Sequence, residues 1–158
     1  RLELVDSSVN RSLTALEERE GPATFPRGWV RHAFHDMTLV GRASYLLKHA
    51  DELGYRAFEE AGRTFTESFI SMRDELRVSR PEIDAAVEAC LTHGALGARI
   101  VGGGFGGAVM ALVKTSRLEE TAQAIAQAYA EHGYAEPRFL PMVAGFPADY
   151  DWLSENFR

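Results

Sequence analysis

The sequence predicts an α+β fold, a two-layer sandwich with helices packed on an antiparallel sheet. Long helical stretches fill the first part of the chain, and two short β-branched runs, 98–101 and 108–113, come before a further helical stretch. Helices followed by neighbouring strands and another helix are typical of this class. With 158 residues, 46% of them hydrophobic, and no shift in composition, the chain predicts a single core.

The first elements in chain order are a short strand and a connector. Residues 2–9 alternate as a strand does, and residues 17–28 are charged and then rich in glycine and proline. We therefore divide the chain into a lead-in strand and connector over 1–28 and a main domain over 29–158.

Four helices are predicted from apolar spacing and from start signals. The first two lie on either side of a break near Gly54. Each of the other two begins with a serine followed three residues later by a glutamate, the capping-box pattern, at Ser79 and Ser116, and they end at Gly94 and Gly133. The apolar stripes of the first two helices are Val30, Phe34, Met37, Val40 and Leu47, and Phe58, Ala61, Phe65, Phe69 and Met72.

The predicted strands 98–101 and 108–113 are joined by a glycine-rich turn, which favours a hairpin. Residues 138–143 could form a last strand, at an edge of the sheet because Pro141 cannot donate a ladder hydrogen bond.

Composition and charge narrow the function classes. With 17 basic and 23 acidic residues the formal net charge is −6, so nothing indicates binding to nucleic acid or to an anionic membrane surface. The chain has no window of eighteen apolar residues and no signal-peptide pattern, which predicts a cytoplasmic protein. The single cysteine, Cys90, falls at a helical core position and is interpreted as packing. Because the sequence begins at Arg1 without a methionine, we expect the C-terminal portion of a longer polypeptide.

Residues 102–107 hold five glycines and one phenylalanine, a composition that fits more than one kind of loop. Gly102, Gly104 and Gly107 match the dinucleotide fingerprint, but that motif needs a helix next, and 108–113 has strand character. A Walker loop is excluded because no Gly-Lys-Ser or Gly-Lys-Thr comes after the glycines. A tight hairpin whose bare backbone packs beneath a neighbour, and a hairpin that borders a phosphate through its amides, both remain open.

Three stretches resemble signatures of the galactokinase branch of the GHMP sugar kinases. Residues 97–107, GARIVGGGFGG, resemble the third signature of that branch, and residues 31–36, RHAFHD, are similar to its Arg-His-Val-Val-x-Glu run. Residues 68–84, SFISMRDELRVSRPEID, are similar to Ser-His-x-Ser-Leu-Arg-Asp-Asp-Tyr-x-Val-Ser-Cys-Pro-Glu-Leu-Asp. With residues 5–13, which resemble the strand leading into the C-terminal half, the likeness covers most of 5–113.

The resemblance implies the ferredoxin-like C-terminal domain of a kinase that transfers the ATP γ-phosphate to the anomeric hydroxyl of galactose or a related sugar. In this family the Gly-Glu-His-x-Asp segment, the serine-containing phosphate loop and the catalytic Arg and Asp lie in the N-terminal half, and none occurs here. ATP and Mg²⁺ are therefore expected to be held mainly by that half. The implied partners are the sugar, ATP, the N-terminal half and a second copy that would pair through an exposed face.

The resemblance also assigns the candidate site residues. It implies no catalytic residue and no metal ligand in this chain, so the chain alone is expected to be inactive. His32 and His35 are three residues apart, but they lack a third ligand at matching spacing and are interpreted as polar-face histidines. The phosphate cleft would be bordered by Gly102, Gly103, Gly104, Phe105, Gly106 and Gly107, with support from Ser68, Ser71, Arg73 and Asp74.

The chain departs from the family pattern at several points. The Tyr-Asn-x-Arg-Arg element that contacts the sugar is missing after Leu13, and Met37 replaces a usual Asn. Phe69, Leu76 and Arg80 stand where the family usually has His, Tyr and Cys. The alternative function is therefore a catalytically inactive sugar or nucleotide sensor, or an interaction domain, that keeps the fold.

Overall fold

The computed structural model describes residue 11, residues 14–15 and residues 27–142. The lead-in strand predicted over 2–9 and nearly all of the connector lie outside these residues. The elements in chain order are α2 (Arg27–Lys48), α3 (Ala50–Leu53), α4 (Tyr55–Asp74), α5 (Pro81–Thr92), β1 (Ala95–Val101), β2 (Ala108–Val113), the 3-10 turn η1 (Thr115–Arg117) and α6 (Leu118–His132).

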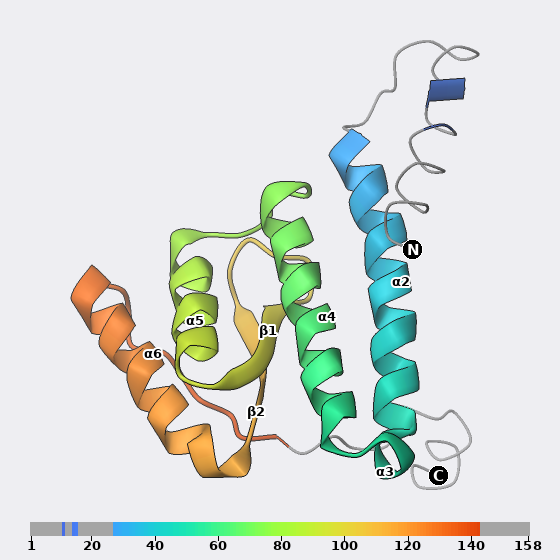
Figure 1. The fold of residues 1–158 in the computed structure, drawn as a ribbon. Coiled ribbons are helices and arrows are strands. Elements are labelled where there is room, and N and C mark those ends of the chain that lie inside the picture. Colours follow the sequence, from blue (N-terminus) through green and yellow to red (C-terminus); the bar gives the residue numbers. More distant parts are fainter. Residues whose placement is uncertain (1–10, 12–13, 16–26, 143–158) are drawn as a thin grey trace, which may run out of the picture.

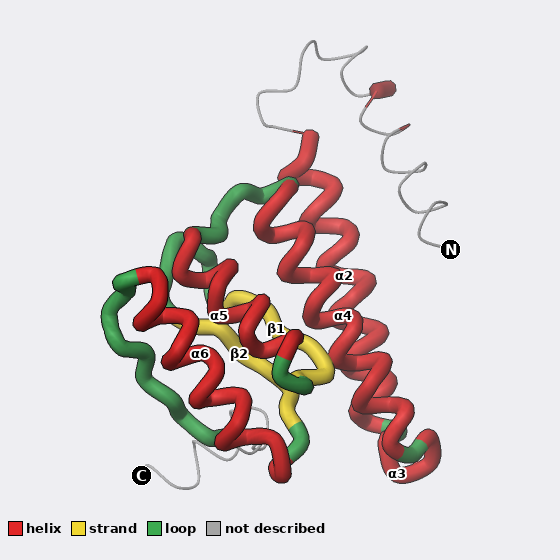
Figure 2. Tube along the Cα trace, turned by 60° about the vertical axis from the view of Figure 1, so that its left-hand side comes forward, coloured by secondary structure: helices red, strands yellow, loops and turns green. Residues whose placement is uncertain are grey.

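The helices form two antiparallel pairs around a hairpin. In Figure 1, α2 and α4 lie side by side on one side of the molecule, α5 and α6 lie on the other, and the β1–β2 hairpin lies between α4 and α5. Figure 2 shows the hairpin beside α5, with α6 on the outer side of α5. This arrangement confirms the α+β class, with helices packed on an antiparallel sheet.

Strands β1 and β2 pair antiparallel, and Val101 pairs with Ala108 at the end where the glycine segment connects them. The register shifts once, between Ala95 and Gly97, where a β-bulge leaves Leu96 without a partner on β2. In the described part of the chain the sheet has two strands. Residues 138–142 form no strand, so the last predicted strand is wrong for those residues.

The main core lies where α4 and α5 meet β1. Its buried side chains are far apart in sequence, and burial of the Cys90 thiol among them raises its pKa to about 11. A thiol with such a pKa stays protonated near neutral pH, which agrees with packing as the role of Cys90. The buried members of this cluster are Phe69, Met72, Val78, Ile83, Val87, Cys90, Ala98 and Ile100.

Helix α4 and strand β1 touch through their backbones at two glycines. A β-carbon added at Gly97 would overlap the Gly62 carbonyl, and one added at Gly62 would overlap the backbone of Leu96. Neither obstacle is a flexible side chain that could move aside. Glycine is therefore required at both positions by contact between two main chains.

The predicted helix starts are partly wrong. Helix α5 has Pro81 in its first turn, but its N-cap is Arg80 and no side chain caps it. The Ser79 hydroxyl instead donates to Asp84 Oδ1 at 2.6 Å. Likewise Ser116 lies inside η1, and α6 begins at Leu118 without a side-chain cap. In both cases the serine pattern marks the right region, although the hydroxyl does not bind the helix amides.

The apolar stripe that predicts α2 lies on its outer face rather than in the core. Phe34, Met37 and Val40 are exposed, Met37 by 72%. The face that packs on α4 buries smaller or aliphatic side chains and places polar ones between the helices. The residues of α2 that are buried are Leu39, Ala43 and Leu46.

Candidate functional site

The glycine loop, Gly102–Gly107, has a backbone that side chains rarely allow. Gly102, Gly104, Gly106 and Gly107 have φ between +79° and +111°, in the left-handed half of conformational space. Phe105 also has a positive φ, +61°, without the freedom of a glycine. The residue is 69% exposed, so the loop presents Phe105 to solvent.

The glycine loop is anchored to residues 75–80, which form the connector between α4 and α5. The Phe105 amide donates to the Val78 carbonyl at 2.7 Å. At Gly104 a β-carbon would overlap the Val78 side chain, so the loop lies flat against that residue. The Arg80 guanidinium donates to the Phe105 carbonyl at 3.4 Å. The hairpin interpretation, in which bare backbone packs against a neighbour, is confirmed at Gly104.

The dinucleotide interpretation is excluded by the element directly after the loop. Residues 108–113 are strand β2 and not a helix, so no helix N-terminus stands behind the glycines to receive a pyrophosphate.

A network of polar side chains joins α2 to α4 beside the core. Arg31 Nε donates to Glu75 Oε1 at 3.0 Å, and the Ser71 hydroxyl donates to Glu75 Oε2 at 2.8 Å. His32 Nδ1 lies 3.0 Å from Ser71 Oγ. Because the Ser71 proton is donated to Glu75, Ser71 Oγ accepts from the His32 Nδ1–H, which assigns the tautomer of the imidazole.

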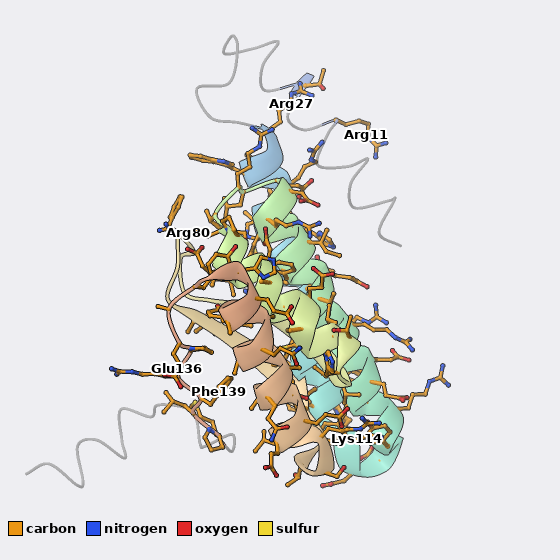
Figure 3. The ribbon with its side chains drawn as sticks, turned by 90° about the vertical axis from the view of Figure 1, so that its left-hand side faces the viewer. Arg11, Arg27, Arg80, Lys114, Glu136 and Phe139 are labelled. Carbon is orange, nitrogen blue, oxygen red and sulfur yellow. The ribbon has the colours of Figure 1, made fainter. Side chains whose placement is uncertain are left out.

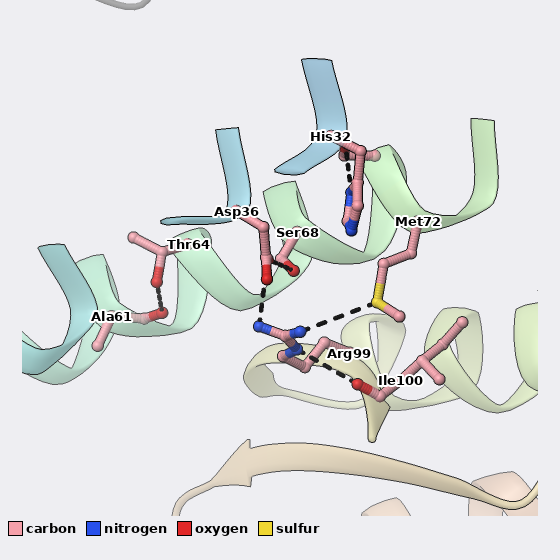
Figure 4. Close-up of polar contacts among 9 residues, drawn as sticks. His32, Asp36, Ala61, Thr64, Ser68, Met72, Arg99 and Ile100 are labelled. Atoms are coloured by element: carbon pink, nitrogen blue, oxygen red, sulfur yellow. Dashed lines mark hydrogen bonds and ion pairs between the residues drawn. The ribbon is translucent and has the colours of Figure 1, made fainter. Parts of the chain in front are cut away.

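A second group of contacts lies one helical turn away on α2 and α4 and reaches strand β1; we call the two groups together the polar network. Asp36 Oδ1 accepts from the Ser68 hydroxyl at 2.5 Å and from Arg99 Nη1 at 3.4 Å. Figure 4 shows Arg99 reaching from β1 toward Asp36 on α2, and its other nitrogens contact the Ile100 carbonyl and Met72 Sδ. With side chains only 20% and 24% exposed, Arg99 and Asp36 form a largely buried ion pair.

Burial lowers the pKa of His32 below its ordinary value of 6.5, against the opposing effect of Asp36 and Glu75. Loss of hydration disfavours the imidazolium, so the neutral ring is the form the fold prefers. The polar network thus holds a neutral histidine that hydrogen-bonds to a serine.

The predicted supporting residues fall into two groups. Ser68 and Ser71 are buried and belong to the polar network. Arg73 and Asp74 instead bind each other at the surface, at 2.7 and 3.0 Å, and this contact lowers the pKa of Asp74. Five further members of the polar network are not among the predicted supporting residues, although all stand inside the matched stretches: Arg31, His32, Asp36, Glu75 and Arg99. His32, interpreted from the sequence as a polar-face histidine, instead hydrogen-bonds to Ser71 of α4.

Two further findings bear on the type of site. Among residues 27–142 no three histidine, cysteine or acidic side chains gather closely enough to hold a metal ion. Within the same described part, none of the helices has the length and apolar character that a membrane crossing needs.

The three stretches that carry the family resemblance meet in the folded chain. The polar network takes Arg31, His32 and Asp36 from the first stretch, Ser68, Ser71 and Glu75 from the second and Arg99 from the third. A family model described as GHMP kinases C terminal matches residues 31–135. The chain belongs to the GHMP kinase family.

Within this family the similar proteins are galactokinases. The chain is 37% identical to a galactokinase of Streptomyces coelicolor over 131 residues, which is 83% of this chain and 32% of the relative. It is 40% identical to galactokinases of Mycobacterium tuberculosis and Bos taurus over 68% and 67% of its length, and it covers 29% and 25% of theirs.

A solved structure agrees with these sequence matches. The galactokinase of Lactococcus lactis, crystallised with galactose, superimposes with a TM-score of 0.63 and 30% sequence identity over 79% of this chain. The match covers 31% of that galactokinase. The chain therefore spans about a third or less of the length of the relatives it matches.

Proposed function

We propose that this chain is the C-terminal part of a sugar kinase that transfers the γ-phosphate of ATP to the anomeric hydroxyl of galactose or a related aldose. The observation that supports this most is the glycine loop, whose main chain is bare, left-handed and anchored at Val78. A loop of this kind lets backbone amides approach a phosphate closely. Residues 97–107, which contain this loop, also resemble the third signature of the family.

In this proposal the chain contributes one wall of the reaction site. Gly102–Gly107 border the phosphates of the bound nucleotide, and the polar network holds the strand from which the loop leaves. Ser68 and Ser71 support the wall through that network. Arg73 and Asp74 remain in the proposal only as a surface pair near the end of α4.

The reacting groups come from outside this chain. The sugar and Mg²⁺-ATP are substrates, and the groups that activate the hydroxyl and neutralise the transferred phosphoryl belong to the rest of a galactokinase-length protein. The N-terminal half is thus the main partner, and a second copy could associate through an exposed apolar face. A kinase that draws on ATP is expected in the cytoplasm.

A chimeric enzyme tests the proposal. Residues 27–142 replace the matching segment of the Streptomyces coelicolor galactokinase, and the transfer of phosphate from ATP to galactose is measured. We expect measurable phosphorylation of galactose or another aldose. The parent enzyme and the parent without its C-terminal segment serve as controls. A chimera that folds but phosphorylates no aldose contradicts the proposal.

Calorimetric titration of this chain with ATP and with galactose tests the alternative of a sensor. If this chain supplies only one side of a kinase site, it makes too few contacts to bind either substrate tightly. We therefore expect no measurable heat of binding. Tight binding by this chain alone would favour the sensor.

A further inference from the structure

Among residues 27–142, two residues other than glycine have a left-handed backbone, and they lie on either side of one contact. Arg77, with φ +58°, stands in the connector between α4 and α5, and Phe105, with φ +61°, stands at the tip of the glycine loop. The Phe105 amide binds the carbonyl of Val78, the residue after Arg77. A left-handed conformation in such residues is unfavourable and persists only where surrounding contacts enforce it.

The contacts at this point form what we call the loop junction: Val78 and Arg80 of the connector with Gly104 and Phe105 of the glycine loop. Both backbone polar groups of Phe105 are used there. Its N–H donates to Val78 at 2.7 Å, and its carbonyl accepts from Arg80 Nη1 at 3.4 Å. The loop tip is thus held from both sides of one residue.

The position and the chemistry of Arg80 both allow it to hold Phe105 at the loop tip. It is the N-cap residue of α5, so its own backbone is fixed to a core helix. Its side chain also passes close to Gly106, where an added β-carbon would lie 3.6 Å from Arg80 Cδ. In Figure 3 Arg80 lies on the side of the molecule away from Lys114, beside the thin connecting segments.

The ion pair of Arg80 with Glu82 does not involve the nitrogen that contacts the loop. Arg80 pairs with Glu82, whose Oε2 lies 3.8 Å from Arg80 Nε. At that distance Nε donates no hydrogen bond to Glu82, and Nη1 is directed to the Phe105 carbonyl. A cysteine, which the resembling family usually has at this position, offers only a short side chain and a weak S–H donor.

We propose that Arg80 is a positioning residue that fixes the tip of the glycine loop through the Phe105 carbonyl. The role in phosphoryl transfer rests on the proposed function, since the loop must border the nucleotide for its geometry to affect the reaction. Arg80 acts through the loop, and its long side chain supplies a contact that a shorter side chain at this position does not reach.

Amide hydrogen exchange of this chain tests the structural part of the inference. In Arg80→Ala, exchange of the Phe105 amide should accelerate about three- to tenfold, the effect of losing one exposed charge-assisted hydrogen bond that restrains the loop. The Ile100 and Val87 amides, in β1 and α5, report the rest of the fold and should not change. Arg80→Lys should restore at least part of the protection.

A matched control separates this effect from a general loss of positive charge. Arg63→Ala removes an exposed arginine of α4 and should leave the exchange of the Phe105 amide unchanged. Equal exchange of the Phe105 amide in wild type and Arg80→Ala would overturn the inference. So would acceleration of the same size in Arg63→Ala.

Kinetics of the chimeric enzyme test the functional part. With the loop tip released, Arg80→Ala should lower kcat several-fold, about as much as the exchange rate changes, with a smaller change in the KM for galactose. Arg80→Lys should recover part of the loss in kcat. An unchanged kcat, with faster exchange of the Phe105 amide, would overturn the role of Arg80 in the reaction.

The two proposals fail in different ways. If the chimera with wild-type Arg80 phosphorylates no aldose, the proposed function fails, while the exchange experiment still decides whether Arg80 holds the loop. If the chimera is active and Arg80→Ala changes neither exchange nor kcat, the proposed function stands and the inference about Arg80 fails.

Discussion

The contact between α4 and β1 and the glycine loop both depend on glycine, but for different physical reasons. At Gly62 and Gly97 the backbone is ordinary and there is no space for a side chain. At Gly102 and Gly107 there is open space, but φ is +79° and +106°. Glycine is therefore needed for close packing in one region and for backbone conformation in the other. Gly104 meets both conditions, because its φ is +87° and Val78 leaves no room.

The largest effect is expected for Gly97→Ala. The new methyl group would overlap the Gly62 carbonyl, and only a shift of strand or helix could relieve it, so the free energy of unfolding should fall by about 3 kcal/mol or more. Urea unfolding followed by circular dichroism measures it. Gly103→Ala is the matched control, since that site has open space and no positive φ and should stay near wild type. Equal stability of the two variants would contradict the close-contact explanation.

The second largest effect on the free energy of unfolding is expected in the polar network. Asp36→Asn removes the charge that pairs with the largely buried Arg99 and should lower the free energy of unfolding by about 2 kcal/mol. Asp74→Asn makes the same change in the exposed pair with Arg73 and should stay within about 0.5 kcal/mol of wild type. If Asp74→Asn proved as destabilising as Asp36→Asn, burial would not be the reason for the difference.

Gly102→Ala tests the second reason for glycine, the positive φ of the backbone. The site has space, so the cost comes only from holding alanine at positive φ, about 1 kcal/mol. Gly41→Ala, in the exposed middle of α2 with open space around it, should instead stabilise the chain by about 0.5–1 kcal/mol through helix propensity. The comparison of the two regions would be wrong if Gly102→Ala proved more damaging than Gly97→Ala.

The smallest effect is a pH dependence that comes from His32. Its pKa in the folded chain is lowered from 6.5, so the unfolded chain binds the proton more readily and the His32 contribution to stability falls as pH drops below about 6.5. Unfolding in urea at about pH 7.5 and about pH 5.5 should show a larger loss in wild type than in His32→Gln. Because the ring is only partly buried, we expect the difference between the two proteins to be modest. A loss of the same size in both would exclude His32 as the source.

Much of the fold was predictable because its signals are local. Pro81 starts α5, Gly133 ends α6 in the left-handed conformation, and the hairpin strands have the β-branched runs that predict them. On α2 the apolar stripe does not coincide with the buried face, so hydrophobicity alone does not identify that face. Phe34 and Met37 are exposed, while His32 and Asp36 face α4, where Ser71 and Ser68 satisfy them. A single sequence does not show which polar groups will find partners.

The loop of the candidate site could be predicted from the sequence, but most of the side chains that support it could not. The glycine cluster and its strand context predicted the hairpin and weighed against the dinucleotide motif, which strand β2 excludes. The Asp36–Arg99 pair joins residues 63 positions apart, and the Gly62–Gly97 contact joins two different elements, so no local spacing reveals either. Arg73 and Asp74 stand in a matched stretch, but they are neighbours that bind each other at the surface. That the loop residues border the nucleotide phosphates stays a prediction.

The contact at Gly97 also fixes the alignment of strand β1 along α4. If β1 slid by one residue, Leu96 or Ala98 would meet the Gly62 carbonyl, and neither has room for its side chain there. The β-bulge at Leu96 lies next to this point and takes up the change in register on the side of β2. Because Gly97 is fixed against α4, the number of residues between Gly97 and Gly102 sets where the glycine loop begins. An insertion or deletion between the two would displace the whole loop relative to α4.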